Sequence, residues 1–246
     1  MTFLKDVVNP GDKVKIFMKQ PVKKKDGTEK VFFETEVLDI TEEGNIAVAI
    51  PTRKTKTVLF PFDVVFVFTF FTKSGIYKCE IEIINRYKIQ NLSFMVLSEK
   101  TRIKKIQRRE YYRLACTLDM NYYLLTQEES TLNSAEEIFN SMRENGIDRL
   151  RERKATIVDI SGGGLRFASK EQVGRENYIL INVALCTGEM EKEFYIVAKV
   201  IASYKNSNDH DIYNQRVEFI FKDNKIRDVI IRYVYQEQRR SRKKKK

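Results

Sequence analysis

The sequence predicts a mainly β protein with two antiparallel β-barrel domains, a helical insertion in the second domain and a C-terminal helix. Three observations lead to this fold class. Short runs of alternating or β-branched residues recur at regular spacing along most of the chain, as in barrels and sandwiches. Helical periodicity is confined to two segments. The 246 residues are enough for two domains that each bury a core.

The pattern of strands and charges divides the chain into four parts. We expect a first barrel over residues 1–99, a linker over 100–110, a second barrel with its C-terminal helix over 111–238, and a basic disordered tail over 239–246. The linker is placed where the chain becomes basic and lacks glycine. We see no internal repeat.

The first barrel is predicted from strand patterns. Residues 13–18 alternate charged and apolar side chains, which is typical of a strand with one buried face. Residues 64–71 are β-branched and aromatic and indicate a buried strand. Asp26-Gly27 is a hairpin signal. The other strands expected in this domain lie at 31–38, 46–50, 58–60 and 76–84.

The second barrel is predicted in the same way. Strands at 154–160 and 165–168 flank a glycine-rich turn. Further strands are expected at 178–183, 193–200 and 215–221.

Two helices accompany the second barrel. Ser134 and Glu137 form a capping box, followed by apolar residues on one face, so that 134–150 is a helical insertion. The second helix begins near Asp223, and its apolar stripe packs on the barrel or pairs with a second subunit. The stripe consists of Ile226, Val229, Ile230, Tyr233 and Val234.

The net charge of +11 invites a nucleic-acid interpretation, but the charge is concentrated at one end. The last eight residues carry seven positive charges, and without them the rest of the chain has a net charge of +4. Such a run is typical of a solvated tail with weak attraction to RNA, DNA or a membrane surface. We therefore expect no specific nucleic-acid partner. The charges belong to Arg239, Arg240, Arg242, Lys243, Lys244, Lys245 and Lys246.

Composition also bears on the compartment. No apolar run is long enough to cross a bilayer, and the N-terminus lacks the pattern of a signal peptide, so a soluble cytoplasmic protein is expected. Cys79, Cys116 and Cys186 are odd in number, far apart and set among apolar residues. This pattern predicts buried thiols in a reducing compartment.

Catalysis has little support in the sequence. The single histidine, His210, lies in a polar segment that is expected to be an exposed loop. A nucleophile elbow would need glycine two residues before Ser161, and Asp159 stands there instead. The glycine run is not followed by the Lys-Ser/Thr pair of a phosphate-binding loop, and clusters of metal ligands are lacking. We expect no enzyme, no cofactor and no metal site.

Two short segments favour binding. The first, 107–113, contains Arg108, Arg109 and Arg113, and an arginine can fork onto phosphate oxygens or onto O6 and N7 of guanine. The second ends a predicted strand and contains Asp159 and Ser161, followed by Gly162, Gly163 and Gly164. One carboxylate suits the two donors N1–H and N2–H of guanine, and glycines allow close approach of the backbone.

Taken together, the segments Arg108-Arg109-x-x-x-Arg113 and Asp159-x-Ser161-x-x-Gly164 resemble the PilZ family of cyclic di-GMP receptors. The β-rich first half looks like the N-terminal domain of YcgR-like flagellar brake proteins. The resemblance implies that Arg109 and Arg113 grip phosphate and guanine, and that Arg108 accompanies binding of a stacked ligand dimer. The 45 residues between Arg113 and Asp159 are a long spacing, stretched by the insertion.

The resemblance also implies a mechanism. The arginine segment would fold over the nucleotide, change the arrangement of the domains and let the protein engage the flagellar motor or switch, which lowers motility. Three alternatives remain open: a nucleic-acid-binding barrel, an adaptor that acts only through protein partners, and a flavin-type ligand in the first barrel. The nucleic-acid alternative predicts binding that survives deletion of residues 239–246.

Overall fold

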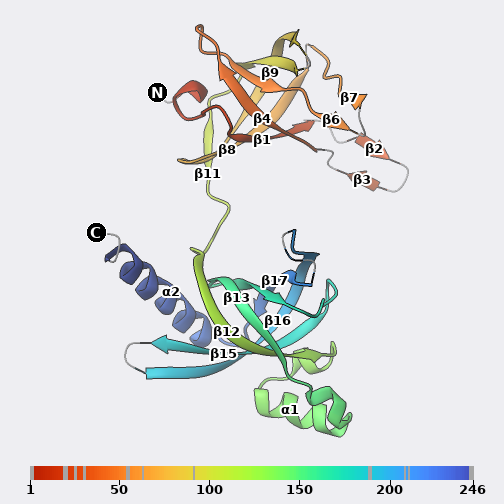
Figure 1. Ribbon diagram of the computed structural model, residues 1–246, viewed down its shortest axis with the longest axis vertical. Coiled ribbons are helices and arrows are strands. Elements are labelled where there is room, and N and C mark those ends of the chain that lie inside the picture. The colour runs from red at the N-terminus through yellow and green to blue at the C-terminus, as the bar shows by residue number, and fades with distance from the viewer. Residues whose placement is uncertain are drawn as a thin grey trace. The chain divides into compact units, whose positions relative to one another are not determined.

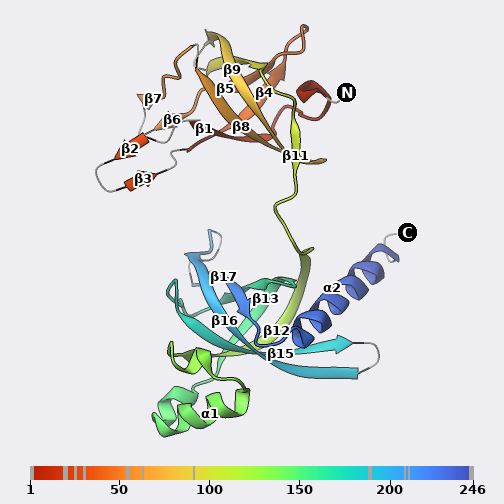
Figure 2. The ribbon, with the colours of Figure 1, turned by 180° about the vertical axis from the view of Figure 1, so that it is seen from behind.

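The computed structural model consists of two compact units, Met1–Arg108 and Arg109–Lys246, and each is described by itself. Figures 1 and 2 show the ribbon from opposite sides. The predictions for Asp26, His210 and residues 244–246 fall outside the described residues. The described residues are 3–18, 22–24, 27–29, 32–53, 56–62, 64–90, 92–187, 190–207, 209 and 211–243.

The first unit is a closed antiparallel barrel. Its strands pair in the order β10-β5-β4-β1-β8-β9, and β10 also pairs with β9, which closes the ring. The short strand β11 pairs with the first part of β9. The described elements are η1 (Leu4–Asp6), β1 (Lys13–Met18), β2 (Val22–Lys24), β3 (Gly27–Glu29), β4 (Phe32–Ile40), β5 (Ile46–Ala49), β6 (Thr52–Arg53), β7 (Lys56–Thr57), β8 (Val65–Thr72), β9 (Gly75–Ile89), β10 (Leu92–Glu99) and β11 (Lys104–Ile106).

Alternating apolar residues fill this first barrel. Val14 and Ile16 of β1 are buried, as the alternation of residues 13–18 predicts, and so are Phe66, Phe68 and Phe70 of β8. In a strand, side chains two apart point to the same face, so one face of each strand supplies the core. This burial is the main stabilising contribution to the unit.

The second unit is also a closed antiparallel barrel, with strand order β12-β13-β14-β17-β16-β15 and a final pairing of β15 with β12. Its fold and that of the first unit confirm the predicted fold class. The described elements are β12 (Leu114–Leu125), η2 (Glu129–Thr131), α1 (Ala135–Glu144), η3 (Ile147–Leu150), β13 (Arg153–Ser161), β14 (Gly164–Ser169), β15 (Tyr178–Thr187), β16 (Met190–Lys205), β17 (Tyr213–Ile220) and α2 (Lys225–Lys243).

The insertion helix α1 begins where the capping box predicts. Ser134 is its N-cap, and the amide of Glu137 donates to Ser134 Oγ at 3.1 Å. The Glu137 carboxylate accepts from the amide of Asn133, one residue before the cap, at 3.0 Å. Ile138 and Met142 are buried in a small cluster with outward-facing residues of β12, β15 and β16. The insertion therefore covers part of the outer face of the barrel.

The C-terminal helix α2 packs on β12, β13 and β15 through Ile230, Tyr233 and Val234, which are buried with the core of the barrel. Core packing thus accounts for the apolar stripe. The helix continues to Lys243, so the prediction of a disordered tail is wrong for Arg239 to Lys243. Arginine, lysine and glutamine are good helix formers, and cations are favoured at the C-terminal end of a helix dipole.

Two other predictions need correction. Residues 58–60 form no strand in the structure, because Phe60 is a buried loop residue that packs edge-on against Phe66 with ring centroids 5.4 Å apart. Cys186 is exposed, whereas Cys79 is buried and Cys116 half-buried. The apolar neighbours of Cys186 did not reveal that the strand end is exposed.

Candidate functional site

The turn between β13 and β14 is held by hydrogen bonds of its own. Ser161 pairs with Gly164 across the hairpin, and Ser161 Oγ donates to the carbonyl oxygen of Gly164 at 2.9 Å. The amide of Phe219 in β17 donates to the carbonyl oxygen of Gly163 at 3.0 Å. The predicted glycine turn is therefore tied to the next strand of the barrel.

The glycines of the turn are required by the protein itself. A Cβ atom at Gly164 would lie 2.1 Å from the carbonyl oxygen of Val217, because β14 and β17 approach closely there. A Cβ atom at Gly162 would lie 2.5 Å from Cδ1 of Tyr111 and 2.8 Å from Cγ1 of Ile231 in α2. Close packing within the unit thus accounts for both residues, where the sequence suggested approach to a ligand.

The same packing brings the arginine segment to the glycine turn. Tyr111 lies against Gly162 and Gly163, and its hydroxyl is hydrogen-bonded to Glu110, which raises the pKa of Tyr111. Three residues later β12 begins and pairs with β13. Arg113 is exposed and stands immediately before this pairing, so the two predicted segments meet in the second unit.

The register of that pairing locates the site along β13. Leu114 lies opposite Ile160, and Ala115 lies opposite Asp159. Arg113 thus immediately precedes the strand that pairs with Asp159, close to the end of β13.

A β-bulge turns Asp159 out of the barrel. The pairing of β13 with β14 slips between Ile157 and Asp159, which makes Val158 an extra residue. Ile157 and Ile160 are both fully buried although they are three residues apart, which strict alternation does not allow. The bulge shifts the alternation by one residue, and the Asp159 side chain lies on the outer face with 20% exposure.

Arg166 belongs to the same outer face, and sequence reasoning did not single it out. It lies opposite Asp159 in the hairpin, and its Nε donates to Asp159 Oδ2 at 2.8 Å. Partial burial lowers the pKa of Arg166, but the bond to the Tyr204 hydroxyl and the charge of Asp159 outweigh it and raise the pKa above its ordinary value. Arg216 pairs with Arg166 across β14 and β17, with its Cζ 5.8 Å from the Tyr204 ring centroid. A register count across the hairpin would have found Arg166.

The remaining predicted residue, Arg108, lies in the first unit. Its Cζ is 5.1 Å from the centroid of the Phe71 ring in β8, at the distance of a cation–π contact. Arg109 is exposed and begins the second unit. The second unit thus contains Arg109, Arg113, Asp159, Ser161 and the three glycines.

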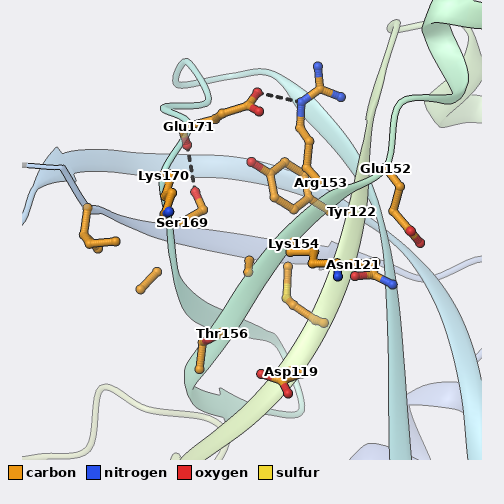
Figure 3. Close-up of a pocket in the computed structure, with 14 residues that line it drawn as sticks. Asp119, Asn121, Tyr122, Glu152, Arg153, Lys154, Thr156, Ser169, Lys170 and Glu171 are labelled. Atoms are coloured by element: carbon orange, nitrogen blue, oxygen red, sulfur yellow. Dashed lines mark hydrogen bonds and ion pairs between the residues drawn. The ribbon is translucent and has the colours of Figure 1, made fainter.

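A cavity of about 750 Å³ opens near the other end of β13, lined by β12, β13 and β14. Figure 3 shows Arg153 directed at Glu171, and these residues are joined by a 2.9 Å bond between Nε and Oε2. Ser169 Oγ donates to the carbonyl oxygen of Glu171 at 2.7 Å. Glu171 is thus paired with Arg153 at this end, and the cavity contains none of the predicted site residues.

Within the described residues, no group of three histidine, cysteine, aspartate or glutamate side chains is placed to hold a metal ion.

In the described part of the chain, we find no helix with the length and apolar character needed to span a membrane.

By its fold, the chain is a protein with two closed six-stranded barrels. On the second barrel, the arginine segment lies beside the glycine hairpin. Residues 9–99 match the family model "PilZNR: Flagellar protein YcgR". The N-terminal domain is therefore similar to that of YcgR, as the sequence predicts for the first half of the chain.

Solved structures share the fold of the whole chain. The Bacillus subtilis inhibitor of motility (MotI/DgrA) is 15% identical, with a TM-score of 0.69 over 96% of this chain and 100% of that chain. YcgR from Escherichia coli, solved in complex with c-di-GMP, is 14% identical, with a TM-score of 0.52 over 95% of this chain and 87% of that chain. No curated protein matches the sequence significantly.

Proposed function

We propose that the protein is a cyclic di-GMP receptor without catalytic activity, and that it binds the nucleotide on the outer face of the C-terminal barrel. One observation carries the proposal: Tyr111 packs on Gly162 and Gly163, which brings the arginine segment beside the hairpin that bears Asp159. The E. coli YcgR structure supports it, because that protein has the same fold and was solved with c-di-GMP.

Each residue has a distinct task in this proposal. Arg109 and Arg113 donate to the phosphates and to O6 and N7 of a guanine. Asp159 accepts from guanine N1–H and N2–H. A carboxylate has about four lone-pair sites, so its bond with Arg166 leaves room for the base. The Ser161 proton is already donated to Gly164, so this hydroxyl acts towards the ligand as an acceptor.

The expected affinity follows from these contacts. Micromolar binding needs about 8 kcal/mol, and hydrogen bonds to charged groups contribute about 1.5–3 kcal/mol each. Two arginines and one carboxylate therefore suffice, after allowance for ordering the arginine segment. Removing one of these side chains is expected to lower affinity by about 100-fold, since it deletes two charged hydrogen bonds.

Calorimetric titration of cyclic di-GMP tests the site. We expect wild type to bind, Arg113→Ala and Asp159→Ala to bind at least 100-fold more weakly by the estimate of about 3 kcal/mol, and Arg143→Ala to bind like wild type. Arg143 is a matched control because it is exposed on α1, away from the hairpin. Equal binding by all four proteins would remove the site.

Cyclic di-AMP provides a second control. Adenine lacks the two adjacent donors that Asp159 is proposed to accept from, so wild type should discriminate strongly against it. The Asp159→Ala variant should lose most of that discrimination. Equal affinity of the wild type for the two dinucleotides would contradict the role of Asp159.

We further propose that binding changes the arrangement of the two domains and thereby lowers motility. The boundary between the units falls between Arg108 and Arg109, inside the arginine segment, which supports a coupling of binding to domain arrangement. The B. subtilis protein of the same fold, MotI, is an inhibitor of motility. Small-angle scattering should change on addition of cyclic di-GMP for wild type and stay unchanged for Asp159→Ala. An unchanged wild-type profile under saturating nucleotide would refute the domain movement and leave the binding proposal intact.

A further inference from the structure

The outer side of α2 is strongly basic along its whole length. At 3.6 residues per turn, six exposed basic residues of α2 fall within an arc of roughly 160°. That arc is opposite Ile230, Tyr233 and Val234, which face the barrel. We call this surface the α2 basic face; it consists of Lys225, Arg232, Arg239, Arg240, Arg242 and Lys243.

Four of these residues lie nearly in a line. Lys225, Arg232 and Arg239 are seven residues apart, and Lys243 follows after four more. At 1.5 Å per residue the line is about 27 Å long, with charges roughly 10 Å apart over most of it. A straight row of cations on one side of a rod matches a flat anionic surface.

Few of the described residues neutralise this face. Arg240 Nη1 is 2.6 Å from Glu237 Oε1, and Asp228 is exposed near the first turns. In the part of the chain that the structure describes, Arg232, Arg239 and Lys243 take part in no salt bridge. Their charges are available to an external partner.

Two features favour a lipid surface over a nucleic acid. The side of α2 opposite the basic face packs on the barrel, so the helix presents its row of cations along one side, as a flat anionic surface requires. Tyr235 lies within the basic arc and is 61% exposed, and tyrosine suits the interface between water and lipid headgroups. The described basic face has no exposed large aliphatic residue, so contact is electrostatic and without insertion.

We propose that the α2 basic face binds the anionic surface of a lipid bilayer. This goes beyond the nucleotide receptor and does not depend on it, because none of the residues of the basic face belongs to the nucleotide site. Each basic residue near such a surface is expected to raise the partition coefficient roughly fivefold at low salt. The attraction should weaken as salt rises, since exposed charges are screened.

Cosedimentation of the full chain with lipid vesicles tests the proposal. The probes are vesicles of phosphatidylcholine with and without phosphatidylserine, each at low and at high salt. The test variant carries Arg232→Gln, Arg239→Gln and Lys243→Gln. The matched control carries Lys88→Gln, Arg102→Gln and Lys104→Gln, which removes the same charge from exposed positions in the other unit.

We expect wild type and the control variant to bind vesicles with phosphatidylserine in a salt-sensitive way, and the test variant to bind about 100-fold more weakly. Circular dichroism should show that all three proteins are folded alike. If both variants lose vesicle binding equally, net charge alone explains the binding, and the proposal is overturned. Absence of wild-type binding to anionic vesicles, or tighter binding to a DNA duplex at the same salt, would also overturn it.

Discussion

Gly164→Ala tests how tightly β14 and β17 pack beside the site. The added Cβ would lie 2.1 Å from the carbonyl oxygen of Val217 and 3.1 Å from its carbonyl carbon. Ordinary contacts between carbon atoms lie at about 3.5 Å. Both opposing atoms belong to the backbone, so no rotation of a side chain can relieve the overlap. One strand must move away from the other.

The cost can be estimated from what that movement breaks. The pairing of Gly164 with Glu218 and the bond from the Phe219 amide to Gly163 would be strained or lost. At about 1 kcal/mol for each hydrogen bond and about 1–3 kcal/mol for overpacking, the free energy of unfolding should fall by about 3–5 kcal/mol. For a domain of this size the midpoint of thermal unfolding should fall by about 10–15 °C.

Thermal unfolding followed by circular dichroism measures the effect, with Gly163→Ala as control. A Cβ atom at Gly163 would meet the Tyr111 ring at 3.3 Å, and that ring can shift. The free energy of unfolding of the control should therefore lie within about 1 kcal/mol of the wild-type value. If the two alanine variants unfold at the same temperature, the close approach of the strands is not as described.

Two further predictions concern the second unit, and a third concerns the buried thiol of Cys79 in the first unit. Gly162→Ala displaces the Tyr111 ring, so calorimetry should show cyclic di-GMP binding that is about tenfold weaker, and the free energy of unfolding should fall by about 1–3 kcal/mol. Unchanged affinity would contradict the role of Tyr111. Arg166→Ala removes the partner of the Asp159 carboxylate, and urea unfolding should detect a loss of about 1 kcal/mol that Arg166→Lys partly restores; full stability of the alanine variant would refute the ion pair. Burial, with the charge of Glu99, raises the pKa of Cys79 to about 12 from 9.0, so stability is expected to fall as pH rises from 9 towards 12, by up to about 1.4 kcal/mol per pH unit. Urea unfolding at pH 8 and pH 10 should show this loss of stability in wild type and a smaller loss in Cys79→Ala. If the free energy of unfolding falls equally with pH in both proteins, the contribution of Cys79 is excluded.

Much of the fold could be predicted because burial in a barrel follows local alternation. Residues 13–18 form a strand with the predicted bounds, and Ser134 caps the insertion helix as predicted. The strand predicted at 58–60 was wrong because an apolar run in a buried loop has the composition of a strand. The disordered tail predicted from Arg239 onward was wrong because charge density alone does not distinguish a tail from the last turns of a helix.

The site was harder to predict than the fold, because its geometry depends on contacts between distant segments. The residue types of Asp159 and Arg113 suggested binding, but the bulge at Val158 that turns Asp159 outward depends on pairing with two neighbouring strands. Glycine is required at position 164 because the backbone of Val217, more than fifty residues away in the sequence, packs against it. Such tertiary constraints leave no local signal in the chain.

Amide NMR spectra of the full chain, recorded with and without cyclic di-GMP, test the central claim most directly. Our account predicts that the largest shifts fall on Arg113, on residues 159–164 and on Arg166. Shifts concentrated instead on residues 119–122 and 152–156, which line the cavity at the other end of β13, would contradict it. So would shifts confined to the first barrel.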